Sequence, residues 1–318
     1  MKLKKIYEEV IKKGKEADPR GKKEIENLLK ERAKFYEKLE AEEKKHFDKE
    51  SLVSPYADTR ILWGNPEGKI SSIIVGIDVG GEELLLVDRL RERGISIDLV
   101  ISHHPQGVAY ATFYEVMDLQ VDILKNTGIN LSFAEKLLEE RKKQVERKIH
   151  PANFYRAIDF ARWLKINFMC MHTPCDNLAY QFMDNLLRRR RPRVLKDILD
   201  ILLEIPEYQE AAKRGNPPKI FLGNKNSRVS KVLVEFTGGT EGSQEIYERL
   251  SSSGVDTIVS MHQSEAHLKK CREAKINVVI ASHIASDSLG VNLMLDYLEE
   301  KARFKIYEFS GFKRFSHK

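Results

Sequence analysis

Two patterns of apolar and polar residues alternate along this chain. Short apolar runs rich in valine and isoleucine are typical of buried strands, whereas apolar residues spaced three and four apart are typical of helices that cover a sheet. Strand-like runs occur at residues 73–75, 99–102, 166–171, 233–235, 256–260 and 278–282, with helical spacing between them. Strands that alternate with helices predict an α/β fold.

The second half of the chain repeats the pattern of the first. In each half a strand is followed by a helix, a strand ending in histidine, a further helix, and a strand leading into a last helix. The last helix begins at a histidine that is followed four residues later by an aspartate: His172 with Asp176, and His283 with Asp287. One helical insertion, at about residues 106–151, lengthens the first copy. The sequence therefore predicts two repeated α/β lobes with a cleft between them.

This repeat defines the expected domains. Residues 1–50 are charge-dense and broken at Asp18-Pro19-Arg20-Gly21, which predicts a helical extension made of a helical pair. Residues 51–215 form the first lobe with its insertion, and residues 216–318 form the second, after Asn216-Pro217-Pro218. The apolar residues of the extension should pack against the lobes or a neighbouring subunit; they are Leu28, Leu29, Phe35 and Leu39.

Composition narrows the possible function classes. The chain has 318 residues, of which 32% are charged, and a net charge of +6. No apolar run approaches the ~20 residues of a membrane span, and the lysine-rich start lacks the apolar core of a signal peptide. Its three cysteines form no CxxC pair, which favours a reduced, cytoplasmic protein without a membrane partner. The moderate positive charge permits an anionic substrate or nucleic acid without requiring either.

Histidines and aspartates at strand ends indicate metal binding. Side chains at the carboxyl ends of strands in an α/β sheet meet in one crevice. His103 and His104 follow one strand, and an imidazole and a carboxylate four residues apart share one face of a helix. Such mixed nitrogen and oxygen donors suit Zn, Mn, Fe or Ni better than Ca or Mg. The remaining repeat members, His172 and His262, either line this cleft or are core histidines bonded to backbone.

Three elements in order resemble a known family. They are Ser102-His103-His104-Pro105, then His172-Thr173 with Asp176, then His283 with an acidic residue four positions later. Over about residues 60–305 the chain resembles the NIF-three-like proteins, which are often described as GTP cyclohydrolase I type 2. The resemblance implies two divalent metal ions in the cleft between lobes and a ring-shaped homo-hexamer. The matching metal ligands here are His103, His104, Asp176, His283 and Asp287.

The chain departs from the family pattern at the last ligands. Asp287 stands where the family usually has glutamate, which reaches farther by one methylene, so the helix that carries Asp287 would have to come closer to the metals. The glycine-containing lead into the last histidine is Ala281-Ser282 here. The Thr-Gly-Glu stretch of the family is Ser260-Met261-His262. Asp78, which follows the first strand, is expected either to support the site or to lie in a surface turn.

A pair of divalent ions about 3.5–4 Å apart can share a water and lower its pKa toward ~7. We therefore expect a dinuclear metal-dependent hydrolase acting on a nucleotide or another anionic small molecule; opening of the GTP purine ring is implied by the resemblance alone. The alternative is a non-enzymatic, metal-containing regulator that binds DNA or a protein partner. The basic run at residues 188–193 separates the two hypotheses. If it faces the cleft it favours an anionic substrate, and if it lies on an exposed rim it favours nucleic acid.

Overall fold

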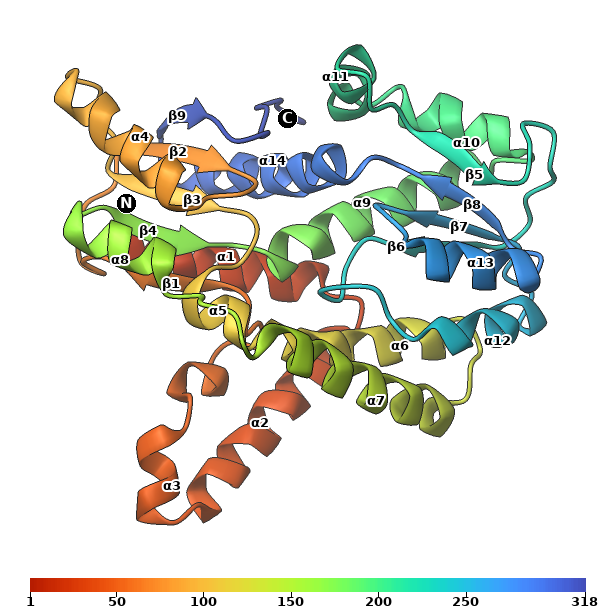
Figure 1. The fold of residues 1–318 in the computed structure, drawn as a ribbon, viewed down its shortest axis with the longest axis horizontal. Coiled ribbons are helices and arrows are strands. Elements are labelled where there is room, and N and C mark those ends of the chain that lie inside the picture. Colours follow the sequence, from red (N-terminus) through yellow and green to blue (C-terminus); the bar gives the residue numbers. More distant parts are fainter.

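Two sheets form the centres of two lobes in the computed structural model, which describes residues 1–318 (Figure 1). The first sheet has the strand order β1-β4-β3-β2-β9, and the second has the order β5-β8-β7-β6. The strands of the first sheet are β1 (Arg60–Trp63), β2 (Ser72–Gly76), β3 (Leu99–Ser102), β4 (Asn167–Cys170) and β9 (Lys305–Glu308). Those of the second are β5 (Lys219–Leu222), β6 (Val232–Glu235), β7 (Thr257–Ser260) and β8 (Asn277–Ile280).

The internal repeat is visible in the pairing of the strands. Strands β2, β3 and β4 are parallel, as are β6, β7 and β8. An antiparallel strand with an irregular register joins each sheet, β1 beside β4 and β5 beside β8. Equivalent hydrogen bonds recur as well, since Ser102 Oγ donates to the His104 carbonyl at 2.7 Å and Ser260 Oγ donates to the His262 carbonyl at 2.6 Å. The predicted α/β fold with two repeated lobes is confirmed.

Alternating strand residues bury opposite faces of each sheet. In the first sheet, Ile73 and Val75 pack with α1, α9 and α14, whereas Ile74 packs with α4 and α8. In the second, Leu233 faces α6, α7, α12 and α13, whereas Val234 faces α9, α10 and α14. The helices concerned are α1 (Leu3–Ala17), α4 (Gly81–Glu92), α6 (Leu119–Asn126), α7 (Leu131–Ile149), α8 (Arg156–Trp163), α9 (Thr173–Arg190), α10 (Leu195–Leu202), α12 (Tyr247–Ser252), α13 (Glu265–Glu273) and α14 (His283–Lys301).

Helices α9 and α14 are equivalent members of the repeat, and both contribute to the core of each lobe. They cross at Gly290, where a Cβ atom would lie 2.8 Å from the carbonyl carbon of Cys175 and closer still to its oxygen. Because real Cβ atoms do not approach backbone so closely, this crossing requires glycine. The crossing brings the first turns of the two helices together between the lobes.

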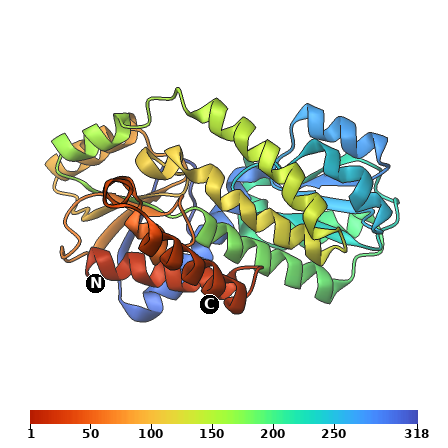
Figure 2. The ribbon, with the colours of Figure 1, turned by 90° about the horizontal axis from the view of Figure 1, so that it is seen from below.

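Several segments lie on the other side of the division expected at residue 216. Helices α10 and α11 (Pro206–Lys213), which precede residue 216, pack on the core of the second lobe. The C-terminal strand β9 returns to the first sheet and pairs with β2, so residues 216–318 do not fold as a separate unit. Within the insertion, α6 and α7 pack on the core of the second lobe (Figures 1 and 2). The other short elements are α5 (Gly107–Ala111), η1 (Lys49–Leu52), η2 (Phe113–Asp118) and η3 (Gln244–Ile246).

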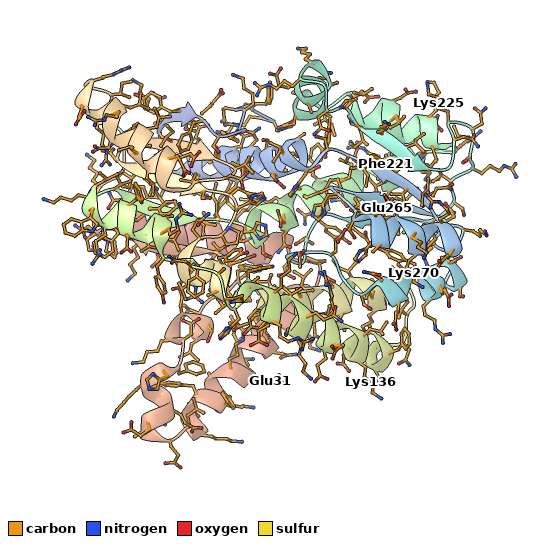
Figure 3. All side chains as sticks on the ribbon, in the orientation of Figure 1. Glu31, Lys136, Phe221, Lys225, Glu265 and Lys270 are labelled. Carbon is orange, nitrogen blue, oxygen red and sulfur yellow. The ribbon has the colours of Figure 1, made fainter.

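The N-terminal extension divides into a buried and a projecting part. Helix α1 is packed through Leu3, Ile6 and Val10 against α9 and α14, whereas α2 (Lys22–Lys38) and α3 (Ala41–His46) project from the body (Figure 1). Charged side chains of these helices are exposed, Glu31 of α2 among them (Figure 3). Within one chain the expected packing of the apolar residues of α2 is incomplete: Phe35 is 59% exposed, and Leu28, Leu29 and Leu39 are half-buried. None of the helices has the length and apolar composition of a membrane span.

Candidate metal centre

His103 and His104 continue the line of β3 beyond its last residue. Their backbone amides donate to the carbonyls of Gly76 and Ile77, each at 2.9 Å, so the chain stays paired alongside β2. The side chain of His103 is fully buried and that of His104 is 23% exposed. Both imidazoles therefore lie at the carboxyl edge of the first sheet, where the fold predicts a site.

The two His-Asp pairs lie in the first turns of α9 and α14. His172 precedes α9, and its carbonyl accepts the backbone amide of Asp176 at 3.1 Å. Helix α14 begins at His283, directly after Ser282, whose φ of +84° lies in the left-handed region. A non-glycine residue there costs about 1–2 kcal/mol, so the start of α14 carries some backbone strain.

All five residues expected as metal ligands come together between the lobes. His103 Nε2 lies 3.3 Å from Asp176 Oδ1 and 3.6 Å from Asp287 Oδ1. Asp287 Oδ2 lies 3.4 Å from the Nε2 atoms of both His104 and His283. Residues from both halves of the repeat thus meet at one point, although ligation itself stays a prediction.

A second set of contacts orients the imidazoles. The Nδ1 atom of His103 contacts the Met171 carbonyl at 3.1 Å, and the Nδ1 atom of His104 contacts Asp78 Oδ1 at 2.7 Å. These acceptors hold the proton on Nδ1 and direct Nε2 toward the shared point, an arrangement typical of metal-ligating histidines. Of the two roles that the sequence left open for Asp78, the structure therefore favours support of the site.

His172 is oriented in the same way by a residue that sequence reasoning missed. Its Nδ1 lies 2.7 Å from Asp58 Oδ2, which also accepts the Thr173 hydroxyl at 2.6 Å. The Nε2 atom of His172 then lies 3.6 Å from Asp176 Oδ2. Asp58 is fully buried just before the edge strand β1, and no pattern in the sequence marked it.

Three buried atoms at the shared point have no hydrogen-bond partner: His103 Nε2, Asp176 Oδ1 and Asp287 Oδ2. Leaving a buried polar atom unpaired costs about 1–3 kcal/mol, so such atoms in a native fold require an explanation. A divalent cation would satisfy all three, and the mixture of imidazole and carboxylate donors suits a transition metal. The residues present therefore fit a metal ion.

The donors fall into two groups that share one carboxylate. His103, Asp176 and Asp287 offer atoms that all lie within 4.8 Å of one another, and so do His104, His283 and Asp287. A third group joins His172 to His103 and His104. These buried His and Asp clusters could bind metal ions, and Asp287 is placed to serve two of the groups. Cys175 belongs to none of them.

The charges of the cluster stabilise each other in the absence of a cation. Burial opposes ionisation of Asp287, but the neighbouring imidazoles, His103 first, lower its pKa well below the usual value. Burial likewise opposes protonation of His104, but Asp287 and Asp78 raise the pKa of its imidazole to about 9. Protons on His103 and His104 thus balance the carboxylates, whereas burial lowers the pKa of His283. A metal ion would have to replace those protons.

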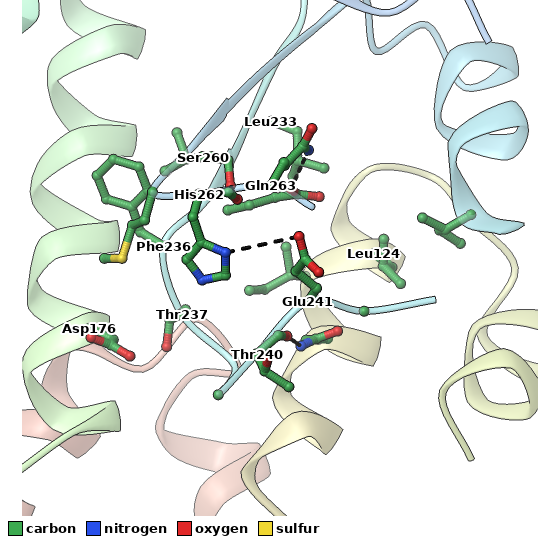
Figure 4. A pocket seen from close by; sticks show the side chains of 18 of the residues that line it. Leu124, Asp176, Leu233, Phe236, Thr237, Thr240, Glu241, Ser260, His262 and Gln263 are labelled. Carbon is green, nitrogen blue, oxygen red and sulfur yellow. Dashed lines mark hydrogen bonds and ion pairs between the residues drawn. The ribbon is translucent and has the colours of Figure 1, made fainter. Parts of the chain in front are cut away.

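A pocket with an empty volume of about 990 Å³, including solvent at its mouth, adjoins this cluster. His172, Asp176, His283 and Asp287 line one end, and His262 lies farther in, with its ring 4.7 Å from that of His283 (Figure 4). His172 and His262 therefore both line the pocket.

The basic run at residues 188–193 does not line this pocket. It lies at the C-terminal end of α9 and continues beyond it, with its arginines exposed. Arg188 pairs with Asp184 at 2.7 Å and Arg190 pairs with Glu204 at 2.6 Å. The arginines thus lie on an exposed surface outside the pocket, and two of them form ion pairs with carboxylates of the same chain.

Solved structures share this fold. The chain is similar to a NIF3 superfamily protein from Sphaerobacter thermophilus, with a TM-score of 0.71 and 26% identity over 82% of this chain and 94% of that chain. It is also similar in fold to reduced HcgD from Methanocaldococcus jannaschii, with a TM-score of 0.50 and 13% identity over 84% of this chain and 94% of that chain. No protein-family model and no curated protein matches the chain. The two repeated lobes and the likeness to the Sphaerobacter protein identify the chain as a NIF3-like protein.

Proposed function

We propose that this protein is a metal-dependent hydrolase that holds two divalent ions through His103, His104, Asp176, His283 and Asp287. The observation that carries the proposal is the pair of donor groups that share Asp287. The three buried atoms without partners give independent support, since each belongs to one of these donors.

When bound, two such ions would polarise the group under attack and activate water at neutral pH. The chain's own residues determine where this happens. Asp287 and Asp176 are 1% and 6% exposed, whereas the side chains of His104 and His283 are 23% and 38% exposed. A substrate would therefore approach on the side of the two exposed imidazoles, of which His283 lines the pocket.

The family resemblance makes a nucleotide or another anionic small molecule the first substrate class to test, with opening of the GTP purine ring as its most specific form. The pocket bears on this choice, because none of its 26 lining residues is lysine or arginine. The lining therefore offers an anionic group histidines and neutral donors but no lysine or arginine.

A metal analysis followed by a hydrolysis screen tests the proposal. Purified protein reconstituted with Zn, Mn, Fe or Ni should hold two ions per chain and hydrolyse at least one member of a panel of nucleotides, phosphoesters and amides. His104→Ala should lose metal and activity, and His150→Ala, which removes an exposed imidazole far along the chain, should lose neither. Activity that survives complete chelation would contradict the proposal.

The exposed arginine run supports a second candidate, a regulator that binds nucleic acid. Binding of single-stranded DNA that weakens steeply with salt and is lost on replacing Arg189, Arg191 and Arg193 with alanine would favour it. The ion pairs of Arg188 and Arg190 reduce the charge available for such binding.

A further inference from the structure

The pocket beside the metal centre continues into the second lobe, between the insertion helices and the second sheet (Figure 4). Its lining is mixed, since 11 of the 26 lining residues are hydrophobic. The apolar part includes Ile123, Leu124 and Leu138 of α6 and α7, together with Leu233 and Ile246. A preformed concave pocket that combines apolar side chains with a few polar groups is the usual form of a small-molecule site.

One side of the pocket is a glycine-rich turn that is held in place. Gln120 of α6 donates through Nε2 to the carbonyls of Gly238 and Thr240, at 2.7 and 2.6 Å. Gly239 has a φ of +83°, and a Cβ atom there would lie 2.9 Å from Val116 Cγ2. The turn lacks the lysine of a phosphate-binding loop, and its contacts to the insertion make it a fixed wall of the pocket.

Two glutamates bring negative charge into this pocket. Glu241 is paired, since it accepts the Ser264 amide and lies 3.3 Å from His267 Nδ1 and 3.9 Å from His262 Nδ1. Glu235, at the end of β6, has one weak partner, Gln263 Nε2 at 3.4 Å. Burial raises the pKa of Glu235 to about 7. Glu235 is thus a carboxylate without a cation in a pocket without lysine or arginine.

We propose that this pocket binds a small molecule with an apolar or aromatic body and a positively charged nitrogen group, an amine or amidinium, that pairs with Glu235. Binding in the pocket is the inference itself; any reaction of the bound ligand at the metal ions rests on the proposed function. A charge-assisted hydrogen bond in an apolar setting is strong because little water competes for it. A ligand with a negative group in the same position would be repelled by the Glu235 carboxylate, which has no cation beside it.

Calorimetric titration of metal-free protein tests this inference with three probes of similar shape: benzamidine, benzyl alcohol and benzoate. Benzamidine should bind most tightly and benzoate least. Glu235→Gln keeps the size of the side chain and removes its charge, and it should weaken benzamidine binding about 10- to 100-fold, the loss expected for a hydrogen bond to a charged group. Glu248→Gln, which removes an exposed carboxylate from the neighbouring helix α12, should leave it unchanged.

Equal or tighter binding of benzoate would overturn the inference, and so would benzamidine binding that Glu235→Gln leaves intact. The comparison of probes on the wild-type protein needs no variant, so a folding defect cannot obscure it. Because these titrations omit metal, their failure is separate from that of the proposed function. A chain that hydrolyses a substrate but does not bind benzamidine more tightly than benzoate refutes the pocket assignment and leaves the hydrolase intact. A chain that binds benzamidine through Glu235 and hydrolyses nothing refutes the hydrolase alone.

Discussion

Replacing Gly290 with alanine tests how the two lobes hold the metal donors together. A Cβ atom at this position would lie 2.8 Å from the Cys175 carbonyl carbon, whereas ordinary contact starts at 3.4 Å. Helix α14 would therefore have to move by at least the difference of 0.6 Å, away from the residue that precedes Asp176. Backbone cannot rotate aside as a side chain can.

Two opposing effects determine the sign of the change in stability. Alanine is favoured over glycine in a helix interior by about 1 kcal/mol, whereas overpacking a buried contact costs about 1–3 kcal/mol. Since the neighbour is backbone, we take the upper part of that range and expect a net loss of about 1–2 kcal/mol. The donor atoms of Asp176 and Asp287 would separate, which should weaken metal binding about 10- to 100-fold, as other disturbances of supporting groups do.

Thermal unfolding and competition with a chelator measure the two effects. Met294→Leu is the matched control, because Met294 lies one turn farther along α14, is fully buried and would change little in volume. The control should retain metal affinity and lose little stability. A Gly290→Ala chain that is more stable than the wild type and binds metal equally well would refute the reasoning, because helix propensity alone would then explain it.

Four further predictions follow from the site and the surface. Asp78→Ala removes the acceptor that holds His104 and should weaken metal binding about 10- to 100-fold in the same competition assay; unchanged affinity would show that the contact is incidental. Asp287→Glu should retain more metal than Asp287→Ala, since it keeps the donor type and restores the usual family residue; equal loss by elemental analysis would refute this. Benzamidine affinity should fall as pH drops from 8 to 6, because the pKa of Glu235 is raised to about 7 and its neutral form cannot pair, whereas a Glu235→Gln chain with the same pH profile would contradict this. The titratable groups close to Glu235 are Glu241, Tyr247 and Cys271, and His262 lines the same pocket. We also propose that the chain forms a hexamer through its projecting helices, so light scattering should find six copies in the wild type and fewer in Phe35→Asp; a wild-type monomer would refute it.

The sequence was sufficient to predict the repeat and to mark the candidate metal ligands at the ends of its strands. Buried parallel strands have continuous apolar runs, which are visible in the sequence. His172 and His283 hold equivalent positions, so the same order of strands and helices occurs twice. The expectation that Asp287 needs a closer helix than the family's glutamate stays a prediction. Sequence spacing gives no distance between helices, so the close crossing of α9 and α14 at Gly290 is seen only in the structure.

Other features depend on contacts that local patterns do not encode. Strand β9 pairs with β2 from the far end of the chain, and β1 and β5 are short edge strands that are partly exposed. Asp58 reaches His172 across more than a hundred residues. Glu235 is the last residue of a buried strand, and only the packing of α6 and α7 reveals that its carboxylate faces a pocket.

The central claim is that two metal ions are held between α9 and α14 by donors from both lobes. Anomalous X-ray scattering from crystals of the metal-reconstituted protein tests it most directly. We predict two peaks about 3.5–4 Å apart, one beside His103 and Asp176, one beside His104 and His283, with Asp287 between them. Peaks elsewhere in the chain, or none at this cluster after reconstitution, would contradict the claim.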